Sequence, residues 1–204
     1  MKYDEILKKL DIMIPNPKCE LEFNKDYELL IATVLSAQCT DKRVNEVTKI
    51  LFSKYDIFSL AKEKKEIIEP MLYPLGSYTK KTLYIIKIAE SLVRDYDGKV
   101  PNNRIYLENL NGVGRKTCNV VLAELFGEPS IAVDTHVKRV SVRLNLANSN
   151  DDVLIIEKKL MKKFPKDKWI RLHHQLVLFG RYICKSKKPE CSKCLFKCKQ
   201  KVLD

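Results

Sequence analysis

Apolar residues recur along most of the chain at the three- and four-residue spacing of helices that bury one face. No stretch alternates with the two-residue period of a strand over a convincing length, so the sequence predicts an all-α fold with short polar connections. Helices are expected at Tyr27–Cys39, after Thr40–Asp41, and at Tyr78–Tyr96, Asn103–Leu110, Arg115–Phe126, Thr135–Leu144, Asp151–Phe164 and Lys168–Tyr182.

Two of these helices show which residues should face the core. The helix after Thr40–Asp41 is expected to bury Val44, Val47, Ile50 and Leu51. The helix Tyr78–Tyr96 is expected to bury Leu83, Ile86, Ala89, Leu92 and Val93.

The positive charge of the chain is concentrated in its last quarter. The 204 residues carry 38 Lys and Arg against 26 Asp and Glu, a formal net charge of +12. Residues 157–204 hold 15 basic and 4 acidic side chains, a net of +11, whereas residues 1–156 hold 23 and 22. A basic block of this kind indicates either a polyanionic partner, most often nucleic acid, or a solvated lysine-rich face.

The composition argues against membrane and secreted proteins. No apolar run approaches the roughly 20 residues that a membrane helix needs. Residues Met1–Leu10 mix charged with apolar side chains and lack the apolar core of a secretory signal. A cytosolic chain of one large or two small domains is therefore expected.

Four of the seven cysteines are close together near the end of the chain, with the spacing Cys184-x6-Cys191-x2-Cys194-x3-Cys198. Four thiolates in one loop can enclose a tetrahedral metal ion or an iron–sulfur cluster, because soft sulfur ligands select for both. Structural zinc usually has two CxxC pairs, and only Cys191 and Cys194 form one here. The spacing therefore favours a cluster over zinc and leaves both open.

A glycine turn lies between two of the expected helices. Residues 110–117 read LNGVGRKT, and Gly112 and Gly114 allow a tight turn whose N–H groups can bind a phosphate. Lys116 follows at the mouth of this turn. Eighteen residues later, IAVDTH leads into another helix, with Asp134 placed as its cap. The phosphate-binding turn, the amine, the carboxylate and the basic cysteine-rich tail together indicate one shared function.

In this order the motifs resemble the endonuclease III family of helix–hairpin–helix DNA glycosylases. The similarity rests on LLIATVLSAQCTD, LNGVGRKTCNVVL, IAVDTHVKRV, HHQLVLFGRYIC and the four-cysteine loop, and it covers roughly residues 20–198. It implies an all-α fold of two domains. One is a six-helix barrel at 22–132 with the helix–hairpin–helix at about 103–126, and the other joins 1–21 to 133–204 and holds a [4Fe-4S] cluster in the loop 184–198.

The resemblance implies a bifunctional enzyme of base excision repair. Such an enzyme removes oxidised pyrimidines as a DNA N-glycosylase and cleaves the strand 3′ to the abasic site as an AP lyase, by β-elimination through a lysine Schiff base. It implies Lys116 as the nucleophile, Asp134 as its acidic partner, and Cys184, Cys191, Cys194 and Cys198 as cluster ligands. An uncharged lysine amine can attack the anomeric carbon, and Asp134 can either accept the amine proton or stabilise the developing cation.

Contacts with DNA are implied as well. The target nucleotide must leave the base stack at a cost of about a few kcal/mol, and Gln38 matches the family residue that fills the vacated space. Ser77 stands where the family often has a bulky apolar wedge, so either Tyr78 substitutes for it or discrimination of the opposite base is weaker. The other expected contacts are Gly112, Gly114, Arg115, Lys185, Lys187, Lys188 and Lys193.

The cysteine loop also departs from the family. Its last two cysteines are separated by three residues, where five are common, so we expect a tighter loop around the cluster.

Two other interpretations share part of the pattern. A glycosylase that acts on mispairs, such as the adenine-removing branch, has similar motifs but generally lacks a lysine at position 116 and carries a further C-terminal domain, whereas this sequence ends at Asp204. A non-catalytic helix–hairpin–helix DNA-binding protein would need the glycines but not Lys116 and Asp134. The expected partner is double-stranded DNA with damaged pyrimidines or abasic sites, bound by a monomer in the cytoplasm.

Overall fold

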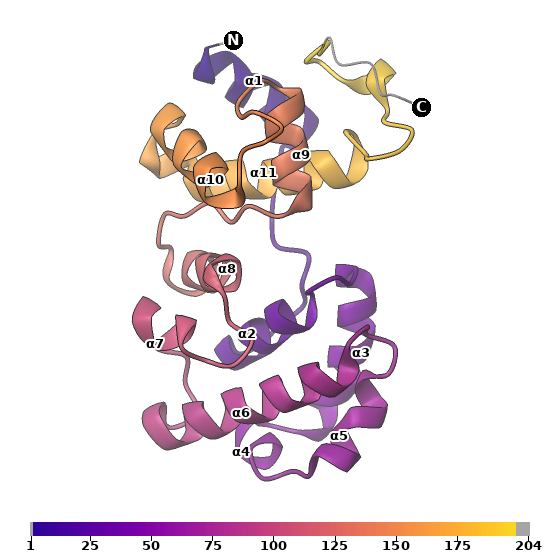
Figure 1. Ribbon diagram of the computed structural model, residues 1–204, viewed down its shortest axis with the longest axis vertical. Coiled ribbons are helices and arrows are strands. Elements are labelled where there is room, and N and C mark those ends of the chain that lie inside the picture. The colour runs from indigo at the N-terminus through magenta and orange to yellow at the C-terminus, as the bar shows by residue number, and fades with distance from the viewer. Residues whose placement is uncertain (1, 199–204) are drawn as a thin grey trace. The chain divides into compact units, whose positions relative to one another are not determined.

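The structure is a computed structural model that describes residues 2–198, and every regular element in this range is helical (Figure 1). The elements are α1 (Tyr3–Met13), α2 (Asp26–Leu35), α3 (Asp41–Lys54), α4 (Ile57–Leu60), α5 (Lys65–Leu72), α6 (Tyr78–Tyr96), α7 (Arg104–Glu108), α8 (Arg115–Phe126), α9 (Thr135–Arg143), α10 (Val153–Lys163), η1 (Lys166–Lys168), α11 (Trp169–Tyr182) and η2 (Cys191–Lys193). The prediction of an all-α fold is confirmed. In the described range no helix is both long and apolar enough to cross a bilayer.

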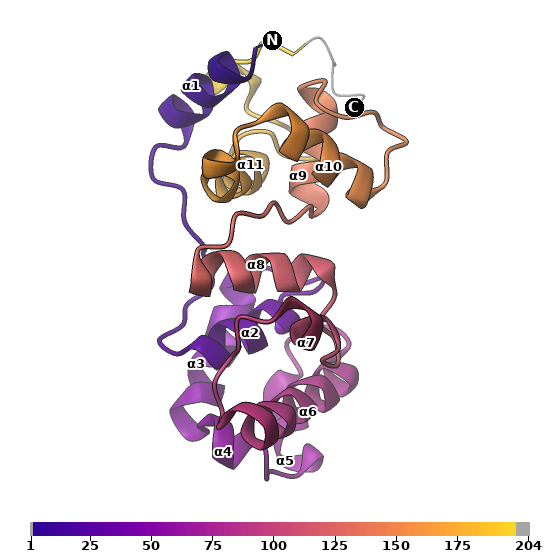
Figure 2. The ribbon, with the colours of Figure 1, turned by 90° about the vertical axis from the view of Figure 1, so that its left-hand side faces the viewer.

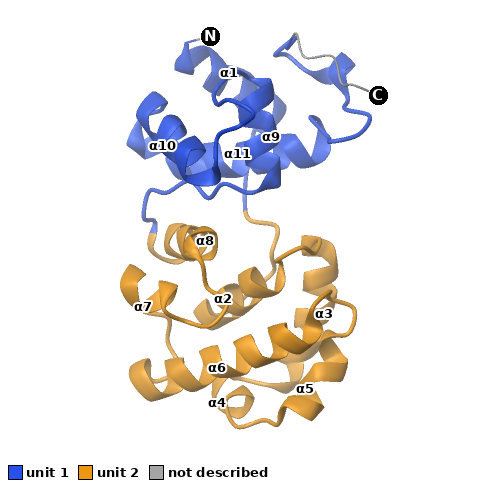
Figure 3. Ribbon diagram, in the orientation of Figure 1, with its two compact units in different colours: residues 1–18, 127–204 blue, residues 19–126 orange. Residues whose placement is uncertain are grey.

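The chain divides into two compact units, coloured separately in Figure 3. Unit 1 comprises residues 1–18 and 127–204, and unit 2 comprises residues 19–126. The sequence suggested boundaries after residues 21 and 132 instead. Both lie a few residues earlier in the structure, because Leu21 packs in the core of unit 2 whereas Ile131 and Val133 pack in the core of unit 1.

Unit 2 is built around α2, whose residues from Tyr27 to Leu35 are all buried. A helix that is apolar all round has to lie inside a protein, and α2 packs against α3, α6 and α8 (Figure 2). Helix α6 packs in turn against α4 and α5. Each fully buried Leu or Ile of this core contributes about 1.5–3 kcal/mol. The packing fixes the turn that follows α2 and the one that precedes α6.

The buried faces of α3 and α6 differ from the predicted ones at one residue each. Ile50 of α3 is 54% exposed, and Leu83 of α6 is 41% exposed. The other predicted residues of α6 are buried or half-buried, and its buried face also includes Ile85 and Ile88 and begins at Lys81. A charged residue stands at the start of this face, so the apolar pattern alone does not show where the face begins.

Unit 1 is centred on α11, which packs against α1, α9 and η1. The first helix of the chain, α1, is held to α11 by polar contacts as well as by apolar packing. Arg171 of α11 donates to Asp11 Oδ1 at 2.7 Å, and Gln175 donates to the same oxygen at 2.8 Å. Residues from the two ends of the chain therefore share one core with α9, the helix that begins after Asp134.

Candidate active site and cysteine cavity

The turn between α7 and α8 needs a glycine at one of its two glycine positions. Gly112 has a φ of +76°, and a Cβ atom added there would lie 2.5 Å from Cδ2 of Tyr84. Gly114 has no positive φ, and nothing lies within 4 Å of the position of its Cβ. The conformation of the turn therefore requires a glycine at position 112. Gly114 instead leaves the exposed backbone open to a close approach by a partner.

Lys116 lies in the first turn of α8, directly after this turn. Arg115 and Lys116 are exposed, whereas the helix from Thr117 to Ala123 is buried in unit 2. The buried part of α8 holds the helix in place, so the Lys116 amine is presented to solvent from a fixed backbone. The first N–H groups of a helix have no partner within it, and they favour an anion at this end.

Asp134 caps the start of α9, as its position in the sequence predicts. It is half-buried, and its Oδ1 accepts a hydrogen bond from the backbone N–H of Val137 at 2.7 Å. This cap holds the carboxylate in one orientation beside His136. Burial lowers the pKa of His136, although the negative charge of Asp134 opposes the shift. Asp134 belongs to unit 1 and Lys116 to unit 2.

The predicted wedge residues lie in two turns of unit 2. Gln38 follows the end of α2, is exposed, and has a φ of +56°. Ser77 precedes α6, is exposed, and has a φ of +57°. Tyr78 is half-buried and packs against Tyr73, with ring centroids 4.4 Å apart. Of the two residues considered as a wedge here, Ser77 before α6 and Tyr78 at its start, Ser77 is thus the more exposed.

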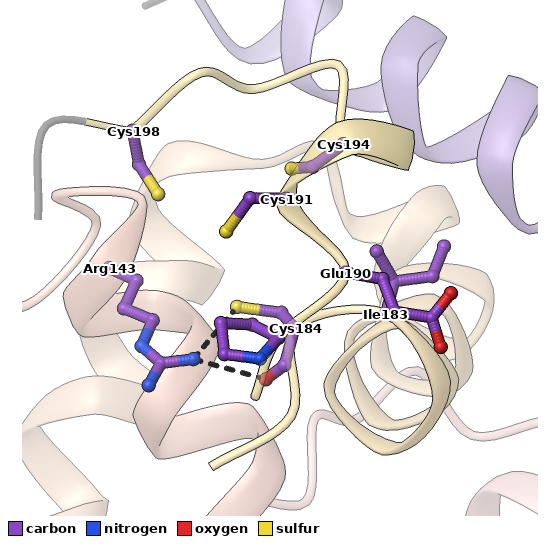
Figure 4. A pocket seen from close by; sticks show the side chains of 8 residues that line it. Arg143, Ile183, Cys184, Glu190, Cys191, Cys194 and Cys198 are labelled. Atoms are coloured by element: carbon purple, nitrogen blue, oxygen red, sulfur yellow. Dashed lines mark hydrogen bonds between the residues drawn. The ribbon is translucent and has the colours of Figure 1, made fainter. Parts of the chain in front are cut away.

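The four clustered cysteines line one small cavity at the end of α11 (Figure 4). All four are free thiols. Burial, together with the neighbouring Cys184, Cys194 and Cys191 thiols, raises the pKa of Cys198. Among residues 2–198 no group of three or more His, Cys, Asp or Glu side chains could hold a single metal ion.

The short spacing before the last cysteine is accommodated by one strained residue. Lys197 has a φ of +45°, which turns the backbone sharply before Cys198. Phe196 is buried and packs edge-on against Phe179 of α11, with ring centroids 5.4 Å apart. This contact fixes the tight loop on the unit 1 core.

Arginines on α9 hold the cysteine loop to that helix. Arg143 donates to the backbone oxygen of Lys185 at 2.7 Å and to the Cys184 thiol at 3.3 Å. Arg139 donates to the Cys184 carbonyl at 3.1 Å and to the Gly180 carbonyl at 2.7 Å. Neither arginine was predicted from the sequence, although their four-residue spacing on one helix indicates that they share a face.

Two of the four lysines expected to bind phosphate are paired within the loop. Lys185 and Lys193 contact Glu190 at 2.7 Å and 2.6 Å. These hydrogen bonds lower the pKa of Glu190 to about 2. Lys187 and Lys188 are exposed, and neither forms an ion pair with a carboxylate within residues 2–198, so of these four lysines they are the most available to a polyanion.

Comparison with known proteins identifies the relatives of the chain. The profile of the HhH-GPD superfamily of base excision DNA repair proteins matches residues 31–166. Endonuclease III of Bacillus subtilis (strain 168) is 46% identical over 192 residues, which cover 92% of this chain and 86% of that protein.

Two solved structures are also similar. One is a non-covalent endonuclease III–DNA complex with 46% identity and a TM-score of 0.91, which covers 95% of this chain and 91% of that chain. The other is a trapped endonuclease III–DNA covalent intermediate with 45% identity and a TM-score of 0.90, which covers 96% and 94%.

Proposed function

The chain belongs to the endonuclease III family of the HhH-GPD superfamily, and we propose that Lys116 and Asp134 carry out its chemistry on DNA. It is a base excision repair enzyme, a DNA glycosylase with AP lyase activity. The observation that supports a catalytic role of Lys116 most directly is its position in α8. It is an exposed amine in the first turn of a helix whose following residues are buried, directly after a phosphate-binding type of turn.

Lys116 would act as the nucleophile. Its amine, once uncharged, attacks the anomeric carbon of the sugar, the bond to the base breaks, and the base leaves with the electron pair and takes up a proton. The lysine nitrogen, now bonded to C1′, gives up a proton. The C1′–O4′ bond then breaks, O4′ takes up that proton, and the open-chain sugar is left as an iminium, a protonated Schiff base, on the lysine nitrogen. This iminium acidifies the neighbouring C2′, and loss of a proton there expels the 3′ phosphate by β-elimination. Water hydrolyses the remaining imine and frees the amine.

Asp134 would support this attack in one of two ways. Its carboxylate can accept the proton of the lysine ammonium, or it can stabilise the positive charge that develops at the sugar as the base leaves. The helix cap at Val137 favours either role, because it keeps the carboxylate in a single orientation.

The remaining substrate contacts concern extrusion of the nucleotide. Gln38 would fill the space left in the duplex, and its exposed place in a tight turn suits insertion. Ser77 has little volume to displace the opposite base, so discrimination between opposing bases would be weak. Equal activity of Ser77→Leu and wild-type protein against all four opposing bases would contradict this expectation.

The four-cysteine cavity suits a [4Fe-4S] cluster. In such a cluster each thiolate bonds a different iron, so the four sulfurs surround a group of atoms rather than one ion. One cavity lined by all four cysteines agrees with that arrangement. Cys184, Cys191, Cys194 and Cys198 would hold the cluster. When bound it would serve to fix the loop that presents Lys187 and Lys188.

The finer features of the substrate also belong to this proposal. The enzyme would act as a monomer in the cytoplasm on double-stranded DNA with oxidised pyrimidines or abasic sites. The net charge of +11 in residues 157–204 supports phosphate binding by the segment that includes the cysteine loop.

Borohydride trapping on abasic-site DNA tests the role of Lys116. The wild-type protein should form a covalent adduct, Lys116→Gln should form none, and the control Lys87→Gln, at an exposed lysine of the same unit, should form as much as wild type. An adduct of normal yield in Lys116→Gln would refute the assignment. A visible absorption band from the purified protein would support the cluster, and a colourless zinc protein would exclude it.

A further inference from the structure

A buried lysine lies next to the turn that carries Gln38. Lys81 of α6 is only 4% exposed, and its Nζ donates a hydrogen bond to the backbone oxygen of Ala37 at 2.9 Å. The two residues are 44 positions apart in the sequence. The contact therefore joins the end of α2 to the start of α6.

The burial of this ammonium group is costly. A buried charge loses its hydration, and only strong hydrogen bonds offset the loss. Burial lowers the pKa of Lys81, which reflects this cost. The acceptor is a carbonyl at the end of a helix, where the backbone dipoles favour a cation. An apolar residue would fill the same space at a lower cost, so the hydrogen bond itself needs an explanation.

The bonded carbonyl belongs to the peptide unit that precedes Gln38. The direction of the Ala37 carbonyl sets the orientation of that peptide plane and so limits the φ of Gln38, which is +56°. A left-handed conformation is strained for a residue with a side chain. Within the turn, the N–H of Cys39 bonds the carbonyl of Ser36 at 3.0 Å. The Lys81 ammonium supports the strained turn from outside.

The same lysine is tied to the second turn through its backbone. The N–H of Lys81 bonds the carbonyl of Ser77 at 3.1 Å, and Ser77 also has a left-handed φ, of +57°. Lys81 thus contacts both turns that would meet the two DNA strands, one through its side chain and one through its main chain. Few single residues could fix these two turns relative to each other.

We propose that Lys81 is a positioning residue, which holds the Gln38 turn in its inserting conformation at a fixed place relative to the Ser77 turn. The proposal rests on the proposed role of Gln38 in filling the vacated space. An ordered turn avoids the entropy cost of ordering when DNA binds. Lys81 would therefore promote extrusion of a stacked base without taking part in the chemistry at Lys116.

The test compares Lys81→Met with Lys87→Met, the same change at an exposed lysine of α6. Single-turnover rates are measured with excess enzyme on a duplex with an oxidised pyrimidine and on one with an abasic site, which has no base to extrude. Lys81→Met should slow base removal by about tenfold to a hundredfold, the value of a hydrogen bond to a charged group. Cleavage at the abasic site should slow by less than about threefold, and Lys87→Met should match wild type on both.

Equal slowing on both duplexes would overturn the proposal, because a general loss of folded structure would act on both. In a Gln38→Ala background, Lys81→Met should add less than about twofold, since its effect passes through Gln38. Full additivity would also overturn it. If Lys81→Met does not fold, Lys81→Arg takes its place, because the longer side chain must displace the Ala37 carbonyl. It too should slow base removal more than abasic-site cleavage.

Backbone chemical shifts separate this proposal from the role of Gln38. In Lys81→Met the shifts of Gln38 and Cys39 should move toward their random-coil values, and unchanged shifts would overturn the positioning role. Wild-type rates in Gln38→Ala alone would instead refute the wedge role of Gln38, on which the proposal rests.

Discussion

Replacing Gly112 with alanine should destabilise the protein, whereas the same replacement at Gly114 should not. Both glycines belong to the LNGVGRKT turn, and both are exposed. At Gly112 the φ of +76° disfavours any side chain, and the new Cβ would overlap Cδ2 of Tyr84 at 2.5 Å. At Gly114 the Cβ would enter open space.

The expected size of the effect follows from these two costs. A left-handed conformation costs an alanine about 1–2 kcal/mol, and forcing extra atoms against a packed ring costs about 1–3 kcal/mol. Together they lower the free energy of unfolding by about 2–5 kcal/mol. A domain of ordinary stability has about 5–15 kcal/mol in total, so Gly112→Ala should still fold. Tyr84 packs against the unit 2 core, which limits how far its ring can move aside.

Urea unfolding of the two variants and the wild type measures the difference. The midpoint should fall for Gly112→Ala with an unchanged slope, and Gly114→Ala should stay within about 1 kcal/mol of wild type. Binding to an abasic-site duplex is the second measurement. Gly114→Ala should bind less tightly despite its normal stability, because its methyl group faces the approaching phosphates. Equal losses of stability in both variants would refute the assignment of different roles to the two glycines.

Three further predictions concern unit 1. Arg143→Met should make the visible absorbance of the purified protein decay faster in air, because loop carbonyls and a thiol lose their donor, whereas the exposed Arg94→Met should decay as wild type does. Affinity for DNA should fall steeply with salt. In a plot of log affinity against log salt concentration, Lys187→Ala should make the slope shallower by about 0.9. Lys185→Ala should change this slope less, because Lys185 is paired with a glutamate. Equal slopes for the two variants would contradict this expectation. Because burial lowers the pKa of His136, its protonation favours the unfolded chain, so this contribution to stability is complete above about pH 6.5 and decreases below it. His136→Asn should lose less stability than wild type between pH 7.5 and 5.5 in urea unfolding, and an equal loss would argue against the assignment.

The longer helices could be predicted because their signal is local. A helix of ten or more residues that buries one face repeats its apolar residues often enough to be recognised, as Tyr78–Tyr96 does. Three helices, α1, α4 and α5, were not expected. Helix α1 buries only Ile6 and Leu10, α4 has four residues, and α5 contains Pro70. Such helices are stable only through tertiary packing.

Helix ends show the same limit. The apolar pattern extends the helix that begins near Tyr27 as far as Cys39, but the structure ends it at Leu35. The residues that follow form the turn that Lys81 supports. Nothing within that segment encodes the support, because the lysine lies 44 residues away from its acceptor.

Residues close together in the sequence specify the reactive groups and the local backbone geometry around them. The glycine turn before Lys116, the cap at Asp134 and the spacing of the four cysteines depend on residues a few positions apart, and short-range backbone geometry determines them. Long-range packing determines which distant groups stabilise this local geometry. Lys81 and Arg143 act across more than 40 residues, and Glu190 pairs with two of the lysines expected to bind DNA. A charged side chain has a similar local pattern whether it faces water or bonds a buried carbonyl, and packing alone distinguishes the two.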